Sequence, residues 1–300
     1  MTKKSKTFIV LGPTACGKSD LAVEIALTQN GEVISADSRQ VYERLNIGTG
    51  KITKKEMRGV KHHLLDVADP KKTFVVTDFQ KLGEQALQDI LSRGKLPIIC
   101  GGTGLYIQAL TDVNNIPEVP PNKKLRTQLE KKSTSELFSK LQKIDPVRAL
   151  TIDKHNPRRL IRAIEIAAAL GSVPVTKPEV RKDIKFLKIG LLPSDELIKE
   201  RIYNRLLTRL DQGMLTEAKK LHTRGLSWKR MEDLGLEYRY MSRHLTGKIS
   251  KQKMIDQLAI EIWHYAKRQK TWFKRDKQIH WFESKDDKKI LKLVKSFLKK

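Results

Sequence analysis

The stretch TFIVLGPTACGKSDLAVEIALTQNG, residues 7–31, decides the fold. An apolar, β-rich run leads into a glycine-rich loop, and the loop leads into a segment with apolar residues at helical spacing. The loop has the spacing G-x-x-x-x-G-K-S of phosphate-binding loops and consists of Gly12, Pro13, Thr14, Ala15, Cys16, Gly17, Lys18 and Ser19. Strand, loop and helix in this order predict that backbone amides at the helix start hold phosphate oxygens.

Two side chains of the loop extend this prediction. Lys18 would add a positive charge that follows the phosphates, and the Ser19 hydroxyl is a candidate ligand for Mg²⁺. The loop alone does not say whose phosphates are held or which reaction follows. A nucleoside triphosphate, and with it a kinase or an ATPase, is the first interpretation.

The rest of the chain predicts an α/β fold with a mainly parallel sheet flanked by helices. Further strands are expected at 32–37, 96–100, 184–194 and 278–283, with helical segments between them. Strands that alternate with helices place ligands at the carboxyl ends of the strands. A terminal amphipathic helix is expected at 288–300.

The sequence changes character after residue 113. The proline-rich NIPEVPPN is followed by polar, helix-forming segments without a convincing strand, at 125–144 and 157–171. We therefore expect a helical insertion at 114–189 within a catalytic core formed by 1–113 and 190–300. Amphipathic helices at 193–225 and 257–275 belong to that core.

The net charge of +26 points to a polyanionic partner such as a nucleic acid. The last hundred residues contain 26 Lys and Arg against 11 Asp and Glu, so more than half of this charge lies there. A lysine-rich surface that serves solubility is the alternative interpretation.

Other features of the composition exclude several classes. No apolar run approaches the roughly 20 residues that span a bilayer, and we expect a soluble, cytoplasmic protein. Cys16 and Cys100 suggest neither a disulfide nor a zinc site. His62 and His63 are interpreted as packing or hydrogen-bonding residues rather than metal ligands.

The strand ends offer one carboxylate and lack another. ATPases of this class usually carry an Asp after an apolar strand, where it helps to hold the metal. Here the run LPIIC is followed by Gly101, Gly102 and Thr103, which weakens the ATPase interpretation. The carboxylate at a strand end is Asp37, which is either a cap of the helix expected to follow or a general base facing the phosphates.

Six motifs taken together resemble the bacterial tRNA dimethylallyltransferases, also called tRNA isopentenyltransferases. They are GPTACGKS, ISADSRQVYERLNIGTGK, HHLLDV, GGTGLYIQAL, NPRRLIRAIEI and KRQKTWFKR, in that order over nearly the whole chain. The resemblance implies transfer of a dimethylallyl group from dimethylallyl diphosphate to N6 of adenosine 37, in the anticodon loop of tRNAs that read codons beginning with U. It also implies a monomer whose glycine-rich loop holds the diphosphate of the prenyl donor.

The resemblance assigns roles to single residues. Asp37 is the general base that takes a proton from the exocyclic amine as the nitrogen attacks C1 of the donor. Lys18, Arg205 and Mg²⁺ at Ser19 stabilise the charge that accumulates on the leaving diphosphate. Thr103 lies near the reacting adenosine. From the residues alone, Arg205 would be a solvent-facing position on a basic helix.

The expected tRNA contacts fall in both parts of the chain. They are Asp37, Ser38, Arg39, Gln40, Thr103, Arg126, Pro157, Arg158, Arg159, Leu160 and Ile161. Chemistry on an anticodon-loop base requires the base to leave its stack, and basic residues would hold the phosphates on either side. A solvated surface role is the alternative for each single arginine.

The sequence departs from the family pattern at several places. Cys16 stands where the family usually has Ser or Ala, which should be harmless because the loop works through its backbone. GTGK at 48–51 replaces the more usual GTAK, and MEDLGLEYRYM at 231–241 replaces a Gly-Tyr-Lys/Arg-Glu segment, so the role of 231–241 stays open. Two other classes are considered beside the prenyl transferase. The charge counts against a kinase of a small metabolite, and the missing carboxylate after LPIIC counts against an ATP-switched RNA-binding protein.

Overall fold

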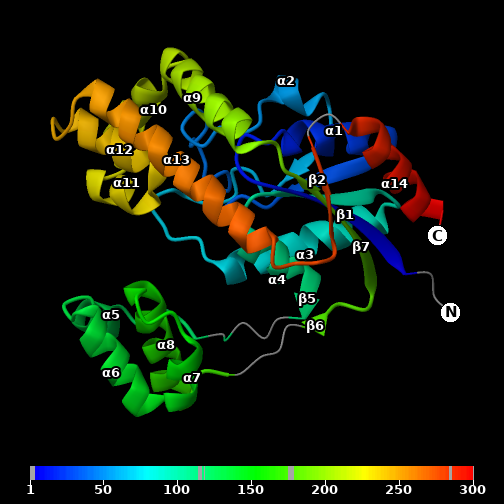
Figure 1. Cartoon of the computed structure of the whole chain (residues 1–300). Coiled ribbons are helices and arrows are strands. Elements are labelled where there is room, and N and C mark those ends of the chain that lie inside the picture. Colours follow the sequence, from blue (N-terminus) through cyan, green and yellow to red (C-terminus); the bar gives the residue numbers. More distant parts are fainter. Residues whose placement is uncertain (1–3, 114–116, 118, 175–178, 284–285, 300) are drawn as a thin grey trace. The chain divides into compact units, whose positions relative to one another are not determined.

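The structure, a computed structural model, describes residues 4–113, 117, 119–174, 179–283 and 286–299 (Figure 1). The chain forms two compact units. One comprises Met1–Asp112 with Val180–Lys300, and the other comprises Val113–Glu179.

A six-stranded sheet forms the centre of the first unit (Figure 1). Its order is β3-β2-β4-β1-β7-β8, and the neighbouring strands run parallel. The strands are β1 (Ser5–Leu11), β2 (Gly31–Ser35), β3 (His62–His63), β4 (Leu96–Gly101), β7 (Ile184–Leu191) and β8 (Ile279–Phe282). The predicted fold class is confirmed. Within this sheet, the two-residue β3 was not predicted, because so short a strand leaves no periodic pattern.

The central strand β1 explains why residues 7–11 are apolar without alternation. Phe8 and Val10 pack in one buried cluster with residues of α1 (Lys18–Thr28) and α14 (Asp287–Lys299). Ile9 and Leu11 point to the opposite face, where they pack with α3 (Val76–Ser92), α4 (Gly104–Thr111) and α13 (Lys251–Phe273). Both faces of the sheet are therefore covered, as is usual for parallel sheets.

The remaining helices of this unit lie between strands of the sheet in sequence, one between β2 and β3 and the others between β7 and β8. They are α2 (Lys54–Met57), α9 (Asp195–Asp211), α10 (Met214–Thr223), α11 (Trp228–Leu234) and α12 (Leu236–Leu245). The helical stretch expected at 193–225 divides into α9 and α10 at Gly213, which has a positive φ of 94°. Helix α13 begins before residue 257 because the Ser250 hydroxyl caps it by accepting the Lys253 amide at 3.2 Å.

The second unit is a small helical body with its own core. It contains α5 (Lys123–Leu129), α6 (Thr134–Ile144), α7 (Pro146–Thr151) and α8 (Pro157–Leu170). Each helix begins at a side-chain cap, namely Asn122, Ser133, Asp145 and Asn156. The short strands β5 (Asp112–Val113) and β6 (Glu179–Val180) pair where the chain enters and leaves this unit.

The boundary of this unit differs from the one expected at 189. Strand β7 pairs with β1 from Ser5↔Ile184 to Leu11↔Gly190, so residues 180–189 lie in the core of the first unit. The expected first residue, 114, lies outside the described residues. Among the described helices, none combines the length and apolar character needed to cross a membrane.

Candidate active site

The glycine-rich loop turns directly from β1 into α1. Gly12 and Gly17 have φ values of 151° and 93°, and a Cβ on Gly12 would lie 2.5 Å from the Leu191 carbonyl oxygen. Gly17 precedes α1 and offers no side-chain cap. The first amides of α1 are thereby left for an anion, which the positive end of the helix dipole also favours.

Two cavities adjoin this loop and share the lining residues Lys18, Ser19 and Arg205. The larger measures about 690 Å³ and the smaller about 70 Å³. Asp37 lines the smaller one. Three of the four predicted catalytic residues, from β2, α1 and α9, thus converge at the carboxyl ends of the strands.

Asp37 lies two residues beyond β2 and holds the turn that follows it. Its Oδ1 accepts the Arg39 amide at 2.8 Å and the Gln40 amide at 3.3 Å. The hydrogen bonds found for this carboxylate among the described residues all end on Oδ1. Residues 38–41 form a turn rather than a helix, so Asp37 Oδ1 holds a turn and the helix-cap interpretation is wrong. Oδ2 is the oxygen that neither of these two hydrogen bonds uses.

Thr103 is hydrogen-bonded to the segment that follows β2, although it does not line either cavity. Its Oγ1 accepts the Ser38 amide at 3.1 Å, and its own amide donates to the Ala36 oxygen at 3.2 Å. Tyr265 of α13 adjoins this point. Burial and the negative charge of Asp37 raise the pKa of Tyr265 to about 12, against a hydrogen bond with Thr103 that lowers it.

Arg205 brings positive charge to both cavities. Arg205 is exposed on α9, as the interpretation from the residues alone expects, yet the protein atoms around its guanidinium and then the positive charge of Arg209 lower its pKa from the usual range. Arginine stays charged at physiological pH even so. Arg209 lines the smaller cavity and lies 3.6 Å from the Glu237 carboxylate.

Two of the departures from the family pattern, Gly50 and the segment 231–241, both contact Arg209. A Cβ on Gly50 would overlap the Arg209 guanidinium, so glycine at 50 and arginine at 209 fit together. Arg209 in turn pairs with Glu237, which lies within the segment 231–241. Burial raises the pKa of Glu237, and Arg209 opposes that effect.

The same segment anchors the loop that ends at Gly50. Tyr238 is fully buried and donates its hydroxyl to Glu217 at 2.7 Å. Glu217 also accepts the amides of Asn46, Ile47 and Gly48 at 2.8 to 3.0 Å. The segment 231–241 therefore supports one wall of the smaller cavity.

Sequence reasoning missed Gln269, which joins two loops of the site. Its Oε1 accepts the Thr14 amide at 2.8 Å, and its Nε2 donates to the Gly102 oxygen at 2.9 Å. The available signal was a polar residue in the apolar series Ile262, Ala266 and Phe273 of α13.

The donors around Ser19 suit a magnesium ion. Ser19 lies exposed at the start of α1, and the larger cavity also has Asp20, Glu24 and Glu56 in its lining. Mg²⁺ prefers oxygen ligands and keeps waters and substrate phosphates in its shell. A hydroxyl with carboxylates around it beside a phosphate-binding loop fits this preference.

The expected tRNA contacts of the insertion fall into two groups. Pro157, Arg158 and Arg159 are exposed in the first turn of α8, whereas Leu160 is buried in the core of the unit and Ile161 is half-buried. A contact through the Leu160 side chain is therefore not available in this fold.

Arg126 is held by an acidic partner within the same unit. Its Nε and Nη2 donate to the two oxygens of the buried Glu165 at 2.9 and 2.8 Å. Arg162 donates to the same carboxylate at 2.5 Å. The guanidinium of Arg126 is about one third exposed, so it presents a fixed edge to solvent.

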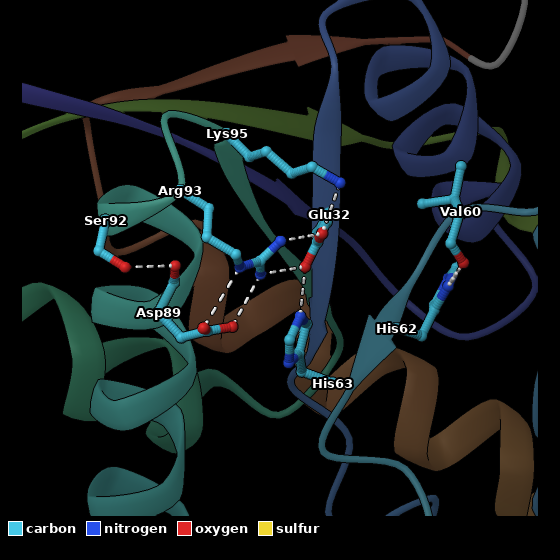
Figure 2. Close-up of polar contacts among 8 residues, drawn as sticks. All are labelled: Glu32, Val60, His62, His63, Asp89, Ser92, Arg93 and Lys95. Atoms are coloured by element: carbon cyan, nitrogen blue, oxygen red, sulfur yellow. Dashed lines mark hydrogen bonds and ion pairs between the residues drawn. The ribbon is translucent and has the colours of Figure 1, made fainter.

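His62 and His63 of β3 both take part in hydrogen bonds, and His62 also lines the smaller cavity (Figure 2). His62 Nδ1 lies 2.9 Å from the Val60 oxygen, and His63 Nε2 lies 2.7 Å from the buried Glu32. Arg93 binds both oxygens of Glu32 at 2.6 and 2.7 Å, and Lys95 adds a contact at 2.8 Å.

Glu32, His63 and Asp89 have the mutual distances of a metal site. A divalent ion there would compete with the cations of Arg93 and Lys95, which already hold Glu32. The hydrogen-bonding interpretation of the two histidines therefore agrees with these contacts.

Comparison with known proteins gives one consistent result. A sequence model described as IPP transferase matches residues 40–276. A tRNA dimethylallyltransferase of Trichlorobacter lovleyi is 43% identical over 282 residues, which are 93% of this chain and 92% of that protein. One from Halalkalibacterium halodurans is 38% identical and covers 97% of this chain and 96% of its own length.

Solved structures agree. The crystal structure of the tRNA isopentenylpyrophosphate transferase from Bacillus halodurans has a TM-score of 0.74 and 37% identity, over 99% of this chain and 96% of that chain. A eukaryotic dimethylallyltransferase acting on tRNA has a TM-score of 0.80 and 27% identity, over 94% of this chain and 74% of that chain.

Proposed function

The chain belongs to the IPP transferase family, and from this premise we propose that it transfers the dimethylallyl group of dimethylallyl diphosphate to N6 of adenosine 37 in tRNA. The acceptors are tRNAs that read codons beginning with U, and the products are N6-dimethylallyladenosine and diphosphate. The observation that carries the proposal is the smaller cavity, where the glycine-rich loop and three cationic side chains surround one carboxylate, namely Lys18, Arg205 and Arg209 around Asp37.

The cationic side of this cavity suits the leaving group. The amides at the start of α1, Lys18 and Arg205 bind the diphosphate of the donor. As the bond from C1 to oxygen breaks, negative charge grows on the diphosphate, and donors fixed in advance stabilise it at little cost in reorganisation.

Asp37 suits the acceptor side. An adenine N6 is a weak nucleophile, because its lone pair is delocalised into the ring. Asp37 accepts the proton that this nitrogen loses as it attacks C1, while Oδ1 keeps the turn of Arg39 and Gln40 in place. The hydroxyl of Thr103, fixed by Ser38, orients the base beside it.

Magnesium is part of the proposal. Ser19 would hold Mg²⁺ together with oxygens of the donor, and the ion would supply positive charge to the diphosphate as it leaves. Removal of divalent ions with a chelator should then stop transfer, whereas tRNA binding without donor persists.

The tRNA contacts are proposed for Ser38, Arg39 and Gln40 beside Asp37 and for the exposed first turn of α8. The net charge of +26 supports a polyanionic acceptor. We propose further that the protein acts as a monomer in the cytoplasm.

The proposal is tested by supplying unmodified tRNA with labelled dimethylallyl diphosphate and, in parallel, with labelled ATP and small-molecule acceptors. Label in tRNA from the prenyl donor is expected. Label transferred from ATP but not from the prenyl donor would establish the kinase alternative instead.

A further inference from the structure

Gln269 is a buried amide that touches both substrate sides of the proposed site. Only 6% of the residue is exposed, and each half of its amide has one partner. Thr14, which donates to Oε1, belongs to the glycine-rich loop. Gly102, which accepts from Nε2, directly precedes Thr103.

This arrangement requires both a donor and an acceptor at position 269. A Cβ on Gly102 would overlap the Gln269 Nε2, so the backbone at 102 comes as close as glycine allows. A buried amide without partners would cost stability, and an apolar side chain would suit this face of α13 better for packing alone. Packing therefore does not account for a glutamine here.

The two loops that Gln269 joins do different work in the proposed reaction. The glycine-rich loop binds the diphosphate and so fixes C1 of the donor. Thr103, held to Ser38 at the end of β2, lies on the side of Asp37 and the acceptor amine. Transfer needs these two centres at roughly 3–3.5 Å, which depends on the register between the loops.

We infer that Gln269 is a positioning residue, which holds the glycine-rich loop and the Gly102–Thr103 turn in one register so that bound donor and acceptor meet at reacting distance. The inference rests on the proposed prenyl transfer. Because Gln269 touches neither substrate, its loss should impair the transfer step more than the binding of either substrate.

Gln269→Met removes both hydrogen bonds at nearly constant volume. We expect kcat to fall about 10- to 100-fold, while KM for dimethylallyl diphosphate and Kd for tRNA change less than about threefold. Gln252→Met is the matched control, because Gln252 is exposed on the same helix and bonds only to Asp256 in the described contacts. This control should keep the wild-type kcat.

Gln269→Glu gives a readout that a packing role would not produce. When protonated, the introduced carboxyl has one acceptor and one donor, as the amide does. When ionised, it has no donor and repels the Gly102 oxygen. Burial raises the pKa of such a group above its ordinary value, so it titrates nearer to neutral pH.

The ratio of kcat for Gln269→Glu to kcat for the wild type should therefore rise as the pH falls from about 8.5 to about 6. Taking the ratio cancels any pH dependence of transfer that the two proteins share. This measurement remains informative if Gln269→Met fails to fold.

The outcomes separate the two claims. A wild-type protein that transfers no prenyl group overturns the proposed function. If the wild type is active, two results overturn the role of Gln269 and leave the proposed function standing. One is a folded Gln269→Met variant with the wild-type kcat, and the other is a kcat ratio of Gln269→Glu to wild type that does not change with pH. A loss expressed only in KM or in tRNA affinity also contradicts it.

Discussion

Asp37 Oδ1 accepts the backbone amide of Arg39 at 2.8 Å, so one carboxylate oxygen is committed to the fold of the turn. This contact allows the structural and chemical roles of Asp37 to be separated. Asp37→Asn keeps an oxygen acceptor for the amide but cannot take a proton. We expect it to lower kcat by roughly 10²- to 10⁴-fold with unchanged thermal stability and tRNA affinity.

Asp37→Ala is the control for the turn. It should be as inactive as Asp37→Asn and, in addition, less stable by about 1 kcal/mol, since the hydrogen bonds from the Arg39 and Gln40 amides are lost. Urea unfolding measures the stability of both variants, and filter retention measures their affinity for tRNA. A fully active Asp37→Asn variant would mean that this carboxylate serves only the turn.

Arg205 should act mainly on the donor. Arg205→Gln removes one cation from the cavities around the glycine-rich loop, and we expect a KM for dimethylallyl diphosphate at least about tenfold higher and a lower kcat. Arg224→Gln, at an exposed position after α10, is the matched loss of charge. If the two variants change KM and kcat equally, the effect comes from the lower net charge of the protein and not from a contact of Arg205 in the site.

Gly50 and Arg209 should be energetically coupled. Gly50→Ala places a methyl group where the Arg209 guanidinium lies and forces a non-glycine residue to φ 58°. The backbone strain, about 1 kcal/mol, should persist in an Arg209→Ala background, whereas the overlap with Arg209 should vanish. Urea unfolding of the four proteins gives the coupling, and an identical cost in both backgrounds would exclude it.

Glu32 should contribute stability that disappears in acid. The Arg93 guanidinium, with Lys95 and His63, holds the pKa of Glu32 far below its usual range despite burial. The contribution is therefore fully present above the unfolded pKa of about 4.3 and is lost as the pH falls below it. Glu32→Gln should cost about 2 kcal/mol at pH 7 and progressively less below about pH 4.

Urea unfolding of the wild type and Glu32→Gln across this pH range tests the sign. Asp89→Asn, at the exposed member of the network, should have a smaller effect at pH 7. A difference between wild type and Glu32→Gln that stays constant down to pH 3 would show that the charge of Glu32 does not stabilise the fold.

The sequence predicted features that local patterns carry. The apolar run of β1, the glycine-rich loop and the periodicity of α1 lie within 25 residues, and Asp37 stands at a recognisable strand end. Gln269 and Tyr265 were not found, because their partners Thr14, Gly102 and Thr103 are more than 160 residues away and meet them only in the folded chain.

The end of the insertion was misplaced because the expected insertion, 114–189, overlapped the strand expected at 184–194. Pairing with β1 places that strand, Ile184–Leu191, in the sheet of the first unit. The contact between Gly50 and Arg209 could not be predicted either. The sequence shows that Gly50 departs from the family pattern, but it does not show which distant side chain packs against this glycine.

The central claim is tested most directly by identifying the modified nucleotide. Unmodified tRNA is incubated with the protein, Mg²⁺ and dimethylallyl diphosphate, and the digested anticodon-loop fragment is weighed by mass spectrometry. We predict one added dimethylallyl group on adenosine 37 and none after Asp37→Asn. An unmodified adenosine 37 in the presence of folded wild-type protein, or a prenyl group on another nucleotide, would contradict the account.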